Sequence, residues 1–174
     1  MGFISKLFAK KAERDAAADM YGDESHYFEE EKPRQGVVPP TAPTDPRLKN
    51  AVPMQDAFGR ELPWGPVMPR EENQYNCGLN FEDYFSRLFD EEFPDYQVTR
   101  EPIKSARPGF RYTFTRNGLI KLYVDVISDT VSTHAFAAEC RRKGIPHMNF
   151  YYNHHGWWNT RTYVTSRVRT AVGV

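Results

Sequence analysis

Cysteine is scarce in this sequence, and long apolar runs are missing from it. The 174 residues include two cysteines, Cys77 and Cys140, too few for a disulfide scaffold or a four-cysteine zinc site. No apolar stretch approaches the roughly 20 residues that a membrane-spanning helix needs. The opening residues also lack the apolar core and the small-residue cleavage site of a secretory signal. We therefore expect a cytoplasmic protein in a reducing compartment.

Acidic residues are missing from the last part of the chain, although the whole sequence is neutral. Its 23 Lys and Arg residues equal its 23 Asp and Glu residues in number. From Arg100 onward, however, 12 basic residues stand against 4 acidic ones, and none of the acidic residues follows Glu139. Because the charges are segregated along the chain, overall neutrality does not exclude an anionic partner.

Proline separates the first part of the chain from the rest. Nine of the 13 prolines lie between Pro33 and Pro69, in a stretch preceded by the acidic text DESHYFEEE. Proline lacks a main-chain donor and fixes φ, which disfavours both helix and sheet. We interpret residues 16–72 as an acidic, proline-rich, disordered linker, in which Leu62 and Trp64 are the residues expected to dock on the folded part.

Residues 1–15 have the pattern of a short amphipathic helix. Phe3, Ile4, Leu7 and Phe8 fall at helical spacing, with lysines beside them. Such a helix can lie on an anionic membrane surface, but a single short apolar face binds lipid only weakly. We expect at most a weak membrane contact through residues 3–8. One hypothesis for the whole chain is therefore a scaffold protein tethered by this helix to a membrane or a partner.

Residues 73–174 carry the patterns of one folded α/β domain. Asn80 is expected to cap a helix that Pro94 ends, and Asn117-Gly118 is the strongest short signal for a hairpin turn. The expected order is a helix, three strands, a helix, a strand and a final helix. The segments expected to form them are 80–93, 95–103, 109–115, 119–128, 133–143, 147–153 and 160–172.

Two stretches of this domain resemble a known family. RPGFRYTFTRNGLIKLYVDVIS resembles the segment that restriction-endonuclease-like, or PD-(D/E)XK, nucleases write as Pro-Asp, strand, turn and a strand ending in (D/E)-x-K. ECRRKGIPHMNFYYNHHGWWNTRTYVTSRV resembles the tail of the very-short-patch-repair endonuclease branch, and the chain resembles a group of uncharacterised bacterial proteins that share FYYNHHGWWNTR. The resemblance implies a three-layer α-β-β-β-α-β(α) fold after a largely disordered N-terminal segment.

The nuclease motif is degenerate in this chain. The position of the first acid falls on Pro108-Gly109, and the (D/E)-x-K position falls on Asp125-Val126-Ile127. One carboxylate survives, but isoleucine can neither ligate a metal nor move a proton. The resemblance therefore implies a nuclease-like fold that is not an enzyme and that needs no cofactor.

An active nuclease is the alternative. These enzymes hold Mg²⁺ with two or three carboxylates, and a nearby lysine orients the attacking water. Asp125 would be the metal ligand in this chain. Glu101 and Glu139 are the residues that could replace the missing acid, and Mg²⁺ would then be required.

The text FYYNHHGWWNTR and the arginines around it form the candidate binding face. Aromatic rings stack on bases while arginines neutralise phosphates, so this composition favours nucleic acid or another anionic partner. A structural interpretation is open beside it, because basic residues at a helix C-terminus also complement the helix dipole and one tryptophan is expected to pack in the core. The candidate residues are Arg141, Arg142, Lys143, Trp157, Trp158, Arg161 and Arg167.

Overall fold

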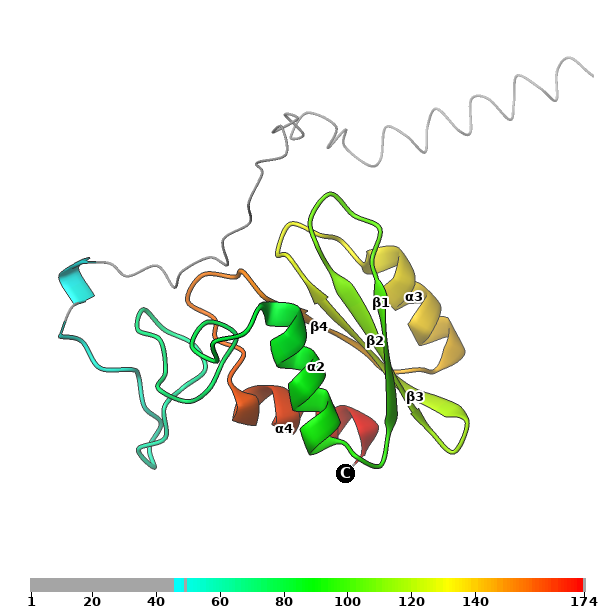
Figure 1. Ribbon diagram of the computed structural model, residues 1–174, viewed down its shortest axis with the longest axis horizontal. Helices are drawn as coiled ribbons and strands as arrows, with labels where there is room; N and C mark the ends of the chain where they lie inside the picture. The colour runs from blue at the N-terminus through cyan, green and yellow to red at the C-terminus, as the bar shows by residue number, and fades with distance from the viewer. Residues whose placement is uncertain (1–45, 49, 174) are drawn as a thin grey trace, which may run out of the picture. The chain divides into compact units, whose positions relative to one another are not determined.

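The computed structural model describes residues 46–48 and 50–173 (Figure 1). This part of the chain is a mixed α/β protein with one four-stranded sheet and three α-helices. The predicted order of the elements is confirmed. After a short 3-10 helix, η2 (Pro46–Leu48), come α2 (Phe81–Glu92), β1 (Gln97–Pro102), β2 (Phe110–Arg116), β3 (Leu119–Ile127), α3 (His134–Lys143), β4 (His147–Tyr151) and α4 (Arg161–Val172).

The strands follow the order β1-β2-β3-β4 across the sheet, so β1 and β4 are its edges. β1, β2 and β3 pair antiparallel, and β4 returns parallel to β3 after α3. Helices α2 and α4 lie together on one face, and α3 lies on the other (Figure 1). The described part of the chain therefore has three layers: the helices α2 and α4, the sheet in the middle, and α3.

The main hydrophobic core lies between the sheet and the pair α2 and α4. The ring of Phe89 on α2 lies 5.0 Å from that of Tyr112 and 5.1 Å from that of Phe114, measured between centroids. Side chains alternate between the two faces of a strand, so these β2 residues point away from α3. The residues of this core are Tyr84, Phe85, Leu88, Phe89, Phe93, Tyr112, Phe114, Leu122, Val124, Val126, Phe150, Tyr152, Val164 and Val168.

Local sequence signals set the ends of α2 and the β2–β3 turn. Asn80 accepts a hydrogen bond from the main-chain N–H of Asp83 at 2.8 Å, as an N-cap does. Asn117 and Gly118 have φ angles of 53° and 71°, both in the left-handed region that the tight hairpin turn requires. Both predictions are confirmed. The turn pairs Arg116 with Leu119, and the register of the two strands shifts once, between Phe114 and Thr115.

The structured chain begins before Asn73, where we had placed its start. The main-chain N–H of Trp158 donates to Pro63 at 2.8 Å, and that of Arg161 donates to Glu72 at 3.0 Å. Trp64 does dock, but through its main chain, because it pairs with Trp157 while remaining 42% exposed. Proline excludes regular ladders from residues 50–72 without excluding an ordered irregular path, so the boundary drawn from proline content was too late.

Other predictions lie outside the described residues. They are the helix over residues 1–15, the membrane contact of residues 3–8, and the linker up to residue 45. Within the part of the chain that the structure describes, no helix is long and apolar enough to cross a membrane.

Candidate functional site

Asp125 lies at the centre of a buried ionic cluster on the sheet face that α3 covers. Its side chain has no exposed surface, and both of its oxygens are bound. Arg111 Nε donates to Oδ1 at 2.8 Å and Arg111 Nη2 to Oδ2 at 3.0 Å, while His147 Nε2 lies 2.9 Å from Oδ2. Burial alone would raise the pKa of Asp125, but the hydrogen bonds from His147 and Arg111 hold that pKa below its ordinary value.

Phe136 of α3 closes this cluster. Its ring centroid lies 3.1 Å from Arg111 Cζ and 5.5 Å from the centroid of the His147 ring. A guanidinium over an aromatic face gains a cation–π interaction as well as shielding from water. The Asp125 carboxylate is therefore held between two fixed side chains beneath a helix.

The other two candidate acids do not join Asp125. Glu101 is an exposed residue of β1, and its partner in the strand register is Arg111 of β2. Glu139 is on α3, where Lys143 Nζ lies 2.5 Å from its Oε1 and lowers the pKa of this carboxyl. Among the described residues, no group of three or more His, Cys, Asp or Glu side chains could hold a metal ion. A cation, the Arg111 guanidinium, lies directly beside the Asp125 carboxylate.

The two degenerate motif positions lie side by side. A Cβ on Gly109 would be 3.1 Å from Ile127 Cγ2, so the end of β3 and the residue before β2 pack closely. Ile127 is fully buried. The chain therefore fills with apolar contact the place that the resemblance assigns to an acid and a lysine.

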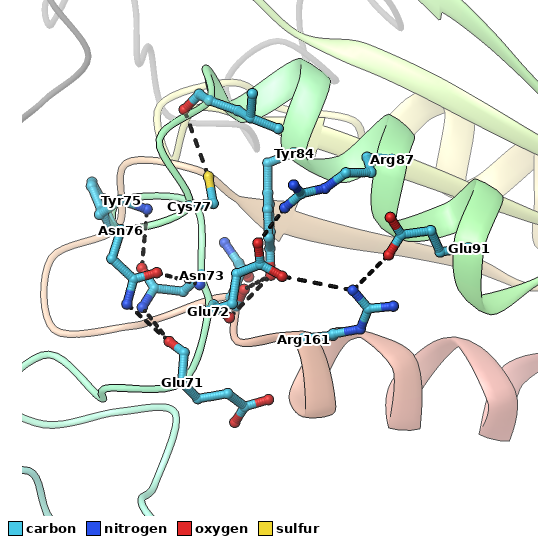
Figure 2. Close-up of polar contacts among 12 residues, drawn as sticks. Glu71, Glu72, Asn73, Tyr75, Asn76, Cys77, Tyr84, Arg87, Glu91 and Arg161 are labelled. Carbon is cyan, nitrogen blue, oxygen red and sulfur yellow. Dashed lines mark hydrogen bonds and ion pairs between the residues drawn. The ribbon is translucent and has the colours of Figure 1, made fainter.

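Arg161, one of the predicted anion contacts, is bound by carboxylates of its own chain (Figure 2). Its guanidinium lies 2.7 Å from Glu91 and 2.6 Å from Glu92, and 3.7 Å from Glu72, which also pairs with Arg87. The hydrogen bonds that Arg161 donates to Glu91 and Glu92 raise the pKa of Arg161. Arg161 thus joins α4 to α2 and to the segment before α2, and its charge is already balanced.

The two tryptophans have different environments. Trp158 is 2% exposed and packs edge-on against Tyr75 at 5.5 Å, so it is a core residue. Trp157 is 38% exposed, and its ring lies 5.9 Å from that of Tyr163 on α4. Sequence reasoning had expected one tryptophan to pack and the other to be available, without saying which.

Arg167 extends the aromatic contact of Trp157. Its guanidinium lies 5.7 Å from the ring centroid of Tyr163 and 5.8 Å from that of Phe150, and Nη1 donates to the Tyr163 hydroxyl at 2.9 Å. No carboxylate within the described residues pairs with it. Trp157, Tyr163 and Arg167 therefore form a continuous surface in which a fixed cation lies beside aromatic rings, and we call these three residues the α4 patch.

The last turn of α3 supplies the remaining predicted cations. Lys143 is paired with Glu139. Arg141 and Arg142 are exposed and form no ion pair within 4.0 Å in the described part of the chain, although Arg142 acts electrostatically on Glu139. Residues three and four apart share one side of a helix, so Arg141 continues the line of His134 and Ala137. This side of α3 runs along β4.

A surface depression of about 340 Å³ lies between that side of α3 and the α4 patch. None of its lining residues is acidic, in contrast to a second depression on α4, which includes Glu92. Sequence reasoning missed most of this surface, because β4 showed only a compact aromatic strand. The lining residues are Val131, Ser132, Thr133, His134, Ala137, His147, Met148, Asn149, Tyr151 and Arg167.

No family model, curated protein or solved structure matches the chain.

Proposed function

We propose that this protein is a binding module that recognises nucleic acid, or another anionic chain, through a basic and aromatic face along β4. The observation that carries the proposal is the α4 patch. It offers an unneutralised guanidinium fixed beside aromatic rings, at the border of a depression without acidic residues. Stacking and phosphate neutralisation are the two interactions that bind single strands regardless of sequence.

The proposed face differs from the one expected from sequence. Arg141, Trp157 and Arg167 lie on it or border it. Arg142 is exposed on α3, and no contact places it on this face. Arg161 and Lys143 are paired with carboxylates, and Trp158 is buried, so they support the fold instead.

We also propose that the domain is a restriction-endonuclease-like fold that has lost its metal-dependent chemistry. The element order and the contact between Gly109 and Ile127 support the first part. The Asp125 environment supports the second, because a carboxylate that accepts from both Arg111 and His147 has no free oxygen for Mg²⁺. Mg²⁺ also needs further oxygen ligands, and the groups beside Asp125 are a guanidinium and an imidazole, which offer nitrogen atoms only.

Fluorescence anisotropy with labelled oligothymidine at low salt tests the binding proposal. Arg167→Gln should weaken binding by roughly tenfold, the equivalent of about 1.4 kcal/mol. Arg169→Gln is the matched control, since it removes the same charge from the same helix but from a side chain that pairs with Glu92 at 3.0 Å. Absence of binding by the unaltered protein at low salt, or equal losses in the two variants, would refute the proposed face.

The nuclease alternative has its own test. Purified protein is incubated with plasmid and with single strands in Mg²⁺ or Mn²⁺, beside Arg116→Gln as a surface control. We expect no cleavage above a buffer blank. The active nuclease would be supported if the unaltered protein and the control both cleave while Asp125→Ala does not, provided that circular dichroism shows this variant to be folded.

A further inference from the structure

The outer edge of β4 carries main-chain groups with no partner among the described residues. In a parallel pair, alternate residues of a strand bond to the neighbour, and the residues between them point their N–H and C=O groups outward. Pro146 accepts from Tyr123, and Tyr152 donates to Ile127, so the even-numbered residues bond to β3. The outward groups are therefore those of His147, Asn149 and Tyr151, of which only the Tyr151 carbonyl is bound, by Asn159.

This edge lacks the features that usually prevent strands from pairing with other chains. Soluble proteins protect edge strands with charged residues, proline or bulges. The opposite edge, β1, has Arg100, Glu101 and Pro102. β4 reads HMNFY, without a Lys, Arg, Asp, Glu or Pro, and its pairing with β3 shows no register shift. One edge of the sheet therefore carries charges and a proline, whereas β4 at the opposite edge is open to pairing with a further strand.

The depression follows this edge and sets the chemistry of such a partner. Four of the five β4 residues line it, with the start of α3 on one side and Arg167 of α4 on the other. An added strand would turn alternate side chains toward His134 on one side and toward Arg167 on the other. With no acidic residue in the lining and Arg141 beyond Ala137, the charge complement is an acidic chain.

We propose that an extended acidic peptide segment of a partner protein adds to β4 as a fifth strand. Main-chain hydrogen bonds to His147, Asn149 and the Tyr151 N–H supply the pairing, and carboxylates on the side of the added strand that faces Arg167 supply the selectivity. The inference rests on the proposed function in one respect, since it uses the same basic face. It goes beyond it by naming a peptide, recognised through its main chain, as the ligand.

Binding of a synthetic peptide tests the strand addition. The probe is a short, end-capped peptide in which Glu alternates with Val, long enough to span β4, titrated by calorimetry against the full chain. Two derivatives carry N-methyl groups, one on the Glu amides and the other on the Val amides. A β-strand presents only one of these two sets of N–H groups to its neighbour. We expect one derivative to lose at least tenfold in affinity and the other to keep its affinity, whereas equal affinities would overturn the proposal.

Protein variants and an oligonucleotide separate this inference from the proposed function. Arg167→Gln should weaken the Glu–Val peptide, and Arg169→Gln should not. If oligothymidine binds but the peptide does not, the strand addition is wrong and the proposed function stands. If neither probe binds, both are wrong. Sedimentation of the unaltered protein measures its oligomeric state. A dimer that the peptide cannot dissociate would overturn the proposal, because the strand partner would then be a second copy of this chain.

Discussion

Replacing Asp125 with asparagine tests the buried ionic cluster that Asp125 forms with Arg111 and His147. The substitution keeps the shape of the side chain and removes its charge, leaving Arg111 without a counter-ion and His147 beside an uncharged amide. The side chains of these two residues are only 15% and 7% exposed, so water can replace the lost carboxylate only partly. Because burial without a partner is costly for a charge, we expect a large loss of stability.

The size of the loss follows from the geometry. Removing one member of a buried ion pair costs about 3–5 kcal/mol. Asparagine retains one acceptor oxygen and Arg111 is partly exposed, so we expect a value near the lower end, about 3 kcal/mol. For a folded part of this size, that loss lowers the melting temperature by about 10 °C.

The pH dependence gives this prediction a sign. The pKa of Asp125 is lower in the folded protein than its ordinary value of 3.8, so the carboxylate contributes stability above that value. The contribution is lost as the pH falls through the folded-state pKa. The stabilities of the unaltered protein and of Asp125→Asn should therefore converge in acid.

Urea denaturation followed by tryptophan fluorescence, at neutral pH and at steps below 3.8, measures both effects. Asp129→Asn is the matched control, because Asp129 has the same chemistry on an exposed loop, where its side chain is 38% exposed. A loss of less than about 1 kcal/mol for Asp125→Asn at neutral pH would place it in the range of exposed pairs and refute the argument. A loss that does not shrink in acid would also refute it.

Two further predictions concern the folded scaffold. Asn80→Ala should lower the free energy of unfolding by about 1 kcal/mol in urea denaturation, because it removes the acceptor that caps α2. Asn80→Ser, which keeps an acceptor without adding a charge beside Asp83, should restore most of the loss, and an unchanged stability in Asn80→Ala would show that this cap contributes nothing. A thiol reagent should label Cys77 well before Cys140, because Cys140 is 2% exposed and burial raises the pKa of its thiol. The single variants Cys77→Ser and Cys140→Ser assign the two labelling rates, and faster labelling of Cys140 would contradict its burial.

The fold was predictable where its signals are local. Asn80 and Asp83 are three residues apart, and Asn117 and Gly118 are adjacent, so the sequence specifies α2 and the β2–β3 hairpin directly. Strand alternation also separates Asp125 from its neighbours Val124 and Val126, which point into the hydrophobic core. It could not show that Phe136 covers the face on which Asp125 lies, since this contact forms only after the chain has crossed over.

The candidate site was less predictable because its contacts join distant segments. Arg161 near the start of a helix reads as an anion site, but its carboxylate partners come from the end of α2 and the segment before it. Trp157 and Trp158 are identical in type, and only packing separates them. Tyr163 carried no signal of its own, although it joins Trp157 to Arg167.

The salt dependence of oligothymidine affinity tests the central claim most directly. If phosphates bind Arg167 and its neighbours, the logarithm of the affinity falls linearly with the logarithm of the salt concentration, by about 0.7 for each neutralised phosphate of a single strand. We predict a measurable negative slope for the unaltered protein, reduced by about 0.7 in Arg167→Gln. The slope of Arg169→Gln should be unchanged. A slope of zero, or the same slope in both variants, would contradict recognition of an anionic chain by this face.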